Sequence, residues 1–149
     1  MSAALKARVS TPLRGFALEL ELTARAGETV ALVGPSGAGK TSLLRVVAGL
    51  MAPHSGCVAL GEETWLDTER GVDVPSERRR CGLLFQDYAL FPRMSAWRNV
   101  AYGIDLPWAE RRPAAIAMLE RFGVAGLADA RPDSLSGGER QRVALARAL

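Results

Sequence analysis

Residues 34–41 read Gly-Pro-Ser-Gly-Ala-Gly-Lys-Thr, which satisfies the pattern G-x-x-x-x-G-K-[S/T] in full. Glycine lets a backbone curl so tightly that several N–H groups can converge on phosphate oxygens. Lys40 would place a point charge between the β- and γ-phosphates, and Thr41 would offer its hydroxyl to Mg²⁺. Lys40 is one of only two lysines among 19 basic residues, which suggests that this site requires an ammonium group. The predicted nucleotide-binding residues are Gly34, Pro35, Ser36, Gly37, Ala38, Gly39, Lys40, Thr41 and Ser42.

A phosphate-binding loop requires a strand before it and a helix after it. Residues 28–33, Glu-Thr-Val-Ala-Leu-Val, read as a continuous buried strand. Apolar residues at helical spacing predict a helix from Lys40 onward. This order of strand, glycine loop and helix favours a phosphate-binding loop over a chance glycine-rich turn.

The remaining segments predict a β-rich α/β core followed by a helical region. Residues 16–22 alternate between apolar and polar side chains, as in a half-buried strand. Short strands are expected at 57–60, 63–67 and 81–85, short helices at 95–104 and 110–124, a linker at 127–134, and a final helix from about Ser136.

The start of the final helix is a second candidate anion site. Ser136 and Glu139 satisfy the S-x-x-E capping box, which by itself would only begin a helix. Gly137 and Gly138 place no side chain over the first-turn N–H groups, and such a helix N-terminus can receive a phosphate. The two interpretations are compatible.

Composition excludes some classes of protein. The net charge of +3 is small and mixed along the chain, which favours a solvated surface over a nucleic-acid patch. No apolar run approaches the roughly 20 residues of a membrane span, and residues 1–12 lack the apolar stretch of a signal peptide, so we expect a cytosolic location. Cys57 and Cys81 form no metal-binding pattern and are expected to be ordinary thiols.

Three segments in a fixed order carry a family resemblance. After the glycine loop come LLFQDYALFP (83–92) and LSGGERQR (135–142), and together they resemble the ATP-binding cassette of ABC transporters over nearly the whole chain. Residues 74–104 are similar to the importer branch for molybdate, sulfate, polyamines, iron or maltose, and AGKTSLLRVVAGL looks most like the molybdate type. The resemblance implies an α/β fold with a P-loop NTPase (RecA-like) core, an antiparallel β-subdomain and a helical subdomain. The implied division is 1–86 for the core and β-subdomain, 87–135 for the helical subdomain and 136–149 for the signature helix.

The resemblance also implies roles for single residues. Gln86 corresponds to the glutamine that contacts Mg²⁺ and the attacking water, so with Lys40 it is a candidate catalytic residue; a buried structural glutamine is the alternative. The LSGGE motif would bind the ATP held by a partner subunit through Leu135, Ser136, Gly137, Gly138, Glu139 and Gln141. The aromatic neighbourhood of Tyr88, Phe91, Pro92 and Trp97 would either face the permease or form the core of the helical subdomain.

The implied protein is an ATPase that uses ATP and Mg²⁺ to power solute import. The resemblance implies a second ATPase subunit, forming a homodimer, and integral membrane permease subunits as partners. A solute-binding protein would act indirectly, and no nucleic acid is expected. The implied protein would be a cytoplasmic, peripheral protein on the inner face of the cell membrane. The alternatives are an ABC ATPase of DNA repair or translation, and a nucleotide-binding product without catalysis.

The same resemblance predicts that elements are missing. The family continues to a strand ending in Asp-Glu, the Walker B motif, and later to a switch histidine. The single histidine, His54, precedes the predicted short strands and is expected in a surface loop. We therefore expect an N-terminal portion, incomplete at its C-terminus, that alone binds nucleotide poorly and hydrolyses little.

Overall fold

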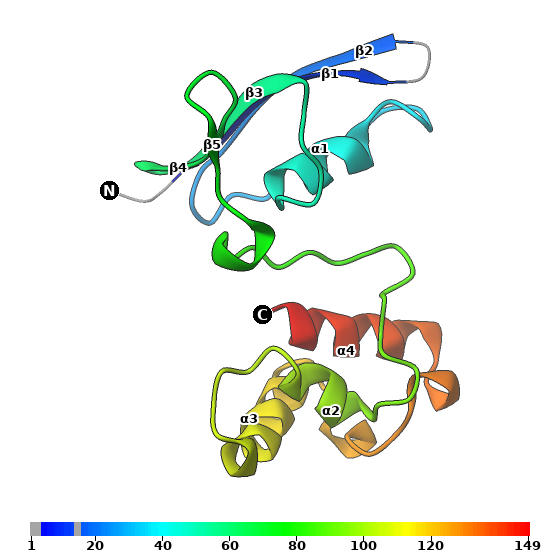
Figure 1. Cartoon of the computed structure of the whole chain (residues 1–149). Helices are drawn as coiled ribbons and strands as arrows, with labels where there is room; N and C mark the ends of the chain where they lie inside the picture. The colour runs from blue at the N-terminus through cyan, green and yellow to red at the C-terminus, as the bar shows by residue number, and fades with distance from the viewer. Residues whose placement is uncertain (1–3, 14–15) are drawn as a thin grey trace. The chain divides into compact units, whose positions relative to one another are not determined.

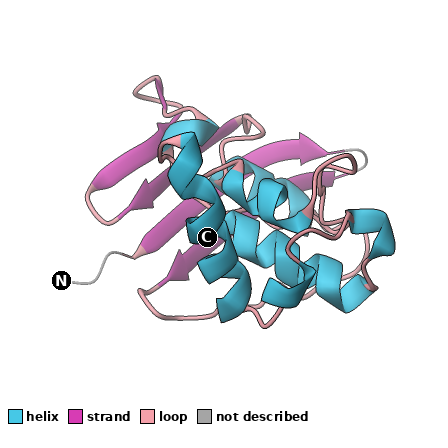
Figure 2. Cartoon of the chain, turned by 90° about the horizontal axis from the view of Figure 1, so that it is seen from below, coloured by secondary structure: helices cyan, strands magenta, loops and turns pink. Residues whose placement is uncertain are grey.

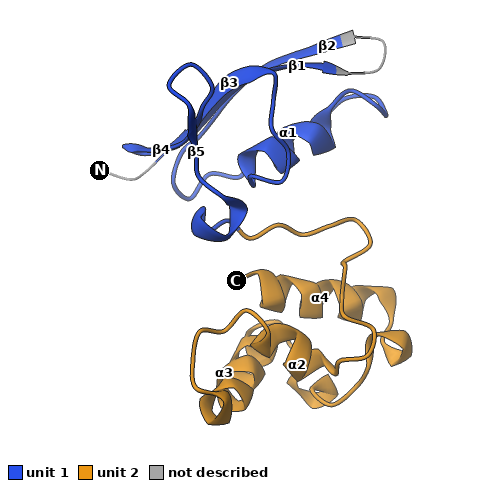
Figure 3. Cartoon of the chain, viewed as in Figure 1, with its two compact units in different colours: residues 1–81 blue, residues 82–149 orange. Residues whose placement is uncertain are grey.

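The structure is a computed structural model that describes residues 4–13 and 16–149. The chain forms two compact units, residues 1–81 and residues 82–149 (Figure 3). In the part of the chain that the structure describes, every strand belongs to the first unit, and the second is built from helices and loops (Figure 2).

The first unit contains an antiparallel sheet with the strand order β2-β1-β3-β4-β5 (Figure 1). Its strands are β1 (Leu5–Leu13), β2 (Phe16–Ala24), β3 (Ser55–Leu60), β4 (Glu63–Asp67) and β5 (Val72–Asp73). The strands predicted at 16–22, 57–60 and 63–67 are confirmed as β2, β3 and β4. Sequence analysis missed β1, whose pairing with both β2 and β3 places it inside the sheet, next to the edge strand β2.

Helix α1 (Lys40–Val47) packs against one face of the sheet. Its side chains Leu43 and Val46 are fully buried, and they share a core with Val9 of β1 and Val58 of β3. Each such side chain contributes about 1.5–3 kcal/mol when it leaves water. This packing holds α1 in place, and with it the glycine loop at its N-terminus (Figure 1).

Two strand predictions were wrong. Residues 28–33 form no strand, and Val30 and Val33 are 39% and 93% exposed. A central strand needs a neighbour to pair with its backbone, and none of the five strands of the sheet pairs with this segment. Residues 81–85 also form no strand, since the chain leaves the first unit there.

Arg79 ties the C-terminal end of α1 to the sheet. Its side chain is buried, and Nη1 donates hydrogen bonds to the carbonyl oxygens of Val46 and Val47 at 2.7 and 3.0 Å. Nε donates to the carbonyl of Val74 at 2.7 Å, and Nη2 pairs with a carboxylate oxygen of Asp73 at 3.0 Å. A positive charge at this place also complements the partial negative charge of the helix C-terminus.

Replacing Arg79 with alanine is expected to lower the free energy of unfolding by about 3 kcal/mol, because several buried carbonyl groups lose their donor. Urea denaturation of the chain measures this change. The exposed neighbour Arg78 is the matched control, and Arg78→Ala should change the stability by no more than about 0.5 kcal/mol. Equal stability of the two variants would contradict the anchoring role of Arg79.

The second unit packs three helices: α2 (Ala96–Ala101), α3 (Trp108–Arg121) and α4 (Gly137–Ala148). They confirm the helices predicted at 95–104, 110–124 and from Ser136. The short 3₁₀ helices η2 (Ala125–Leu127) and η3 (Pro132–Ser134) lie at the two ends of the predicted linker, and η1 (Ser76–Arg78) belongs to the first unit. The core includes Trp97, Val100, Leu119, Leu135 and Val143. Among the described residues, no helix is both long enough and apolar enough to cross a membrane.

Candidate nucleotide-binding and signature sites

The glycine loop runs from Gly34 to Gly39 and leads directly into α1. Gly37 and Gly39 adopt φ values of 83° and 87°, a left-handed conformation that side chains disfavour. Gly39 is the N-cap of α1, where no side chain caps the helix and no acidic residue lies in the first turn. The first-turn N–H groups of α1 therefore have no competing side-chain acceptor.

Lys40 spans the base of this loop. Its Nζ atom donates hydrogen bonds to the carbonyl oxygens of Gly34 and Pro35, each at 2.7 Å. Thr41 is exposed, and Ser42 is half-buried on the next position of the helix. The structure thus brings the ammonium group, two hydroxyl-bearing residues and the loop backbone together at one end of α1.

The loop is suited to a phosphate group. A Cβ placed on Gly37 would meet no atom within 4 Å, so the space beside the loop is open. The uncapped helix N-terminus and the ammonium group of Lys40 both favour an anion at this point. The residues present therefore fit the triphosphate of a nucleotide.

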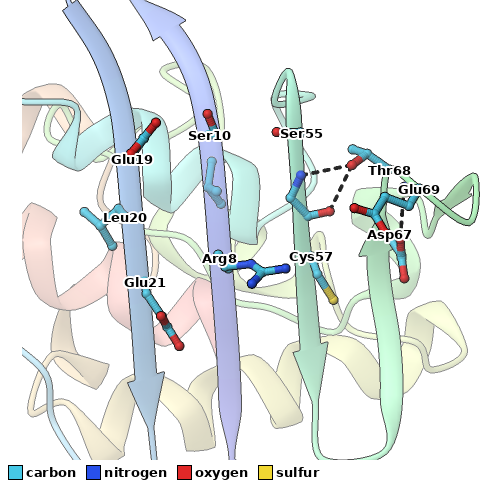
Figure 4. Close-up of a pocket in the computed structure, with 12 residues that line it drawn as sticks. Arg8, Ser10, Glu19, Leu20, Glu21, Ser55, Cys57, Asp67, Thr68 and Glu69 are labelled. Carbon is cyan, nitrogen blue, oxygen red and sulfur yellow. Dashed lines mark hydrogen bonds between the residues drawn. The ribbon is translucent and has the colours of Figure 1, made fainter.

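A separate groove of about 660 Å³ lies on the sheet, and its charge argues against a nucleotide there (Figure 4). The side chain of Arg8 extends from β1 toward Cys57 on β3. Four acidic residues also line the groove: Glu19, Glu21, Asp67 and Glu69. This excess of negative charge would repel a triphosphate.

The predicted capping box at the start of α4 is present. The Ser136 hydroxyl accepts a hydrogen bond from the Glu139 backbone N–H, and a Glu139 carboxylate oxygen accepts one from the Ser136 backbone N–H at 2.7 Å. The hydrogen bond from the Ser136 backbone, followed by that of its side chain, lowers the pKa of Glu139 below its usual value.

The signature residues comprise one buried residue and several exposed ones. Leu135 is 3% exposed and packs in the core of the second unit. Ser136, Gly137, Gly138 and Gln141 are exposed. A Cβ placed on Gly137 would meet no atom within 4 Å, so the N-terminus of α4 is accessible to a ligand.

Gln86 lies in a turn rather than in a core. The Tyr88 N–H donates to the carbonyl of Phe85 at 3.0 Å, which places Gln86 and Asp87 in the middle of the turn. Gln86 is exposed, so the alternative of a buried structural glutamine is wrong. Tyr88 and Ala89 have φ values of 62° and 45°, which are rare for residues with a side chain.

The residues that follow Gln86 do not share one environment. Trp97 is 9% exposed and belongs to the core of the second unit. Phe91 is half-buried, with its ring centroid 4.7 Å from that of Tyr102, whereas Pro92 is exposed. The core interpretation is therefore confirmed for Trp97.

Sequence analysis missed two residues whose side chains form hydrogen bonds with the backbone of residues 88–91. Asn99 is fully buried, and its side chain binds both the N–H and the carbonyl of Phe91. Arg147 near the end of α4 donates to the carbonyls of Tyr88 and Ala89. Burial lowers the pKa of Arg147, although an arginine remains charged. The sequence spacing between these partners offers no local signal.

The structure assembles the candidate residues in two groups. The glycine loop, Lys40, Thr41 and Ser42 belong to the first unit, and Gln86 and the signature residues belong to the second. Both groups lie within the part of the chain that matches a known family. The sequence profile of that family, described as ABC transporter, matches residues 18–149. The chain belongs to the ABC transporter family. This membership confirms the resemblance and the predicted α/β fold class.

Known ABC proteins show the branch to which the chain is similar. It is 47% identical over 137 residues to the molybdenum import ATP-binding protein ModC of Brucella abortus (strain 2308), covering 90% of this chain. It is 45% identical over 139 residues to the protein of the same name from Mycobacterium tuberculosis (strain CDC 1551 / Oshkosh), covering 89% of this chain. The chain spans 37% and 38% of the length of these two relatives.

A solved ABC structure supports the same fold. The dimeric post-hydrolysis state of the ATP-binding cassette MJ0796, bound to ADP and Pi, matches with a TM-score of 0.70 and 29% sequence identity. The match covers all of this chain and 69% of the cassette. An antiparallel sheet with the glycine loop and α1 in one unit, and helices in the other, are therefore elements of an ABC cassette.

Proposed function

We propose that the chain is the ATP-binding part of an ABC importer ATPase, which powers uptake of an oxyanion such as molybdate. One observation carries the nucleotide assignment: the glycine loop presents Lys40 and bare backbone N–H groups at the uncapped N-terminus of α1. The 47% identity to a molybdenum import ATP-binding protein supports the solute class. It also favours an importer over an ATPase of DNA repair or translation.

In this function, the loop residues bind and orient the triphosphate. Lys40 would exchange its two carbonyl partners for β- and γ-phosphate oxygens, while Ser42 would contact a further oxygen. The hydroxyl of Thr41 and the side-chain oxygen of Gln86 would hold Mg²⁺, which when bound neutralises charge on the phosphates. Gln86 would also orient the attacking water.

The signature residues would serve the ATP of a second subunit. The exposed N-terminus of α4, with Gly137 and Gly138 leaving its N–H groups uncovered, is suited to a γ-phosphate held by the partner's loop. Such an arrangement requires a dimer of cassettes, and a dimer is also the state described for the MJ0796 cassette. We propose a homodimer.

The remaining partners follow from the importer assignment. We propose that the cassettes bind integral membrane permease subunits at the cytoplasmic face of the membrane, and act with a solute-binding protein only indirectly. The turn after Gln86, with half-buried Tyr88 and exposed Pro92, is the proposed contact region.

Reconstitution of the full-length protein with the permease and binding protein in proteoliposomes tests this function. We expect ATP turnover to rise in the presence of molybdate-loaded binding protein and to be unaffected by maltose. Stimulation by maltose instead of molybdate would contradict the solute class. A full-length protein that binds no ATP by calorimetry, or whose turnover responds to DNA or ribosomes, would contradict the importer assignment.

A further inference from the structure

The C-terminal turn of α4 contacts the segment that follows Gln86. Nη1 of Arg147 donates to the carbonyl oxygen of Ala89 at 2.8 Å, and Nη2 donates to that of Tyr88 at 3.0 Å. The same guanidinium group lies over the ring of Phe91, with Cζ 5.3 Å from the ring centroid. Two nitrogens bound to two successive carbonyls use the planar fork that distinguishes arginine from lysine.

The two carbonyls bound by Arg147 belong to the residues with unusual backbone conformations. Tyr88 and Ala89 both have positive φ values, 62° and 45°, in the left-handed region. Such conformations persist only where surrounding contacts hold them. Arg147 provides these contacts, and the Tyr88 N–H closes the turn that contains Gln86.

A different residue holds the next part of this segment. The side chain of Asn99, on α2, accepts a hydrogen bond from the Phe91 N–H at 2.8 Å and donates to the carbonyls of Phe91, Met94 and Ser95. Hydrogen bonds therefore attach the turn at Gln86 to α4, whereas they attach the backbone of Phe91 and the carbonyls of Met94 and Ser95 to Asn99 of α2.

We propose that Arg147 is a positioning residue that orients Gln86 and couples it to the signature residues. Ser136 and Arg147 lie at opposite ends of α4, a helix of 12 residues, or about 18 Å. Because the helix links them, a shift of the signature end that accompanies ATP binding by the partner would also move the turn of Gln86. This proposal rests on the proposed function, but the hold of Arg147 on the turn can be tested separately.

Hydrogen exchange of the chain measures that hold. In Arg147→Met, which keeps side-chain length but removes the donors, the Tyr88 amide should exchange about tenfold faster or more. The amide of Val124, which donates to the carbonyl of Leu119, should change by less than about twofold. Arg121→Met is the matched control, since Arg121 is exposed at the end of α3. Unchanged exchange at Tyr88, or equally faster exchange throughout the second unit, would overturn the proposal.

ATP turnover in the assembled transporter measures the functional consequence. Arg147→Met should lower kcat about tenfold while the KM for ATP stays within about twofold, because the loop around Lys40 is unaffected. Arg147→Lys should recover part of the loss. An unchanged kcat would overturn the coupling role. If the unsubstituted protein showed no ATP turnover, the proposed function would fail, while the exchange experiment would still decide whether Arg147 holds the turn.

Discussion

In the full-length protein, Lys40→Ala is expected to weaken ATP binding by at least about a hundredfold. The Lys40 ammonium donates hydrogen bonds to the carbonyls of Gly34 and Pro35 at the start of the loop. This group lies at the N-terminal end of α1, where a triphosphate is proposed to bind. Losing charged hydrogen bonds to phosphate costs about 3 kcal/mol or more, which corresponds to that change in Kd. Isothermal titration calorimetry with ATP measures it.

The other lysine of the chain provides the matched control. Lys6 is exposed on β1, and Lys6→Ala should leave the Kd for ATP unchanged. Lys40→Arg tests whether charge alone suffices: because the guanidinium fork is larger than an ammonium group, we expect it to restore little of the affinity. Tight ATP binding by Lys40→Ala would show that the glycine loop is not the nucleotide site.

In the full-length protein, Ser136→Arg is expected to preserve ATP binding by the monomer but to lower turnover roughly a hundredfold or more. Ser136 is exposed beside Gly137 and Gly138, and a long side chain would occupy the space in which a partner's phosphate is proposed to bind. Loss of preorganised donors at a reacting phosphate has effects of this size. Nucleotide affinity, dimer formation with ATP in gel filtration, and ATP turnover are measured together.

Ser136→Ala separates obstruction from loss of the cap. It removes the hydroxyl that accepts from the Glu139 N–H, which costs about 1 kcal/mol of helix stability, but it adds no bulk. We expect this variant to dimerise and to retain much more turnover than Ser136→Arg. Normal turnover by Ser136→Arg would exclude the signature role of this helix N-terminus.

The wrong strand predictions show the limit of apolar patterns. Residues 28–33 are as apolar as a buried strand, yet Val33 is almost completely exposed and no strand of the described sheet pairs with them. Strand formation depends on a partner that supplies backbone hydrogen bonds, and composition within one segment does not contain that information. The strand β1 was missed for the same physical reason. It forms because β2 and β3 supply its backbone hydrogen bonds, and its own sequence does not show those partners.

Sequence motifs are sufficient to predict the features whose partners are close along the chain. Lys40 and its carbonyl partner Gly34 are six residues apart, and Ser136 and Glu139 are three apart, so a motif specifies each arrangement locally. The contacts of Arg79 with Val46, 33 residues away, and of Arg147 with Tyr88, 59 residues away, became visible only in the folded structure. These long-range contacts depend on how the helices and strands pack within each unit, which a local pattern of residues does not encode.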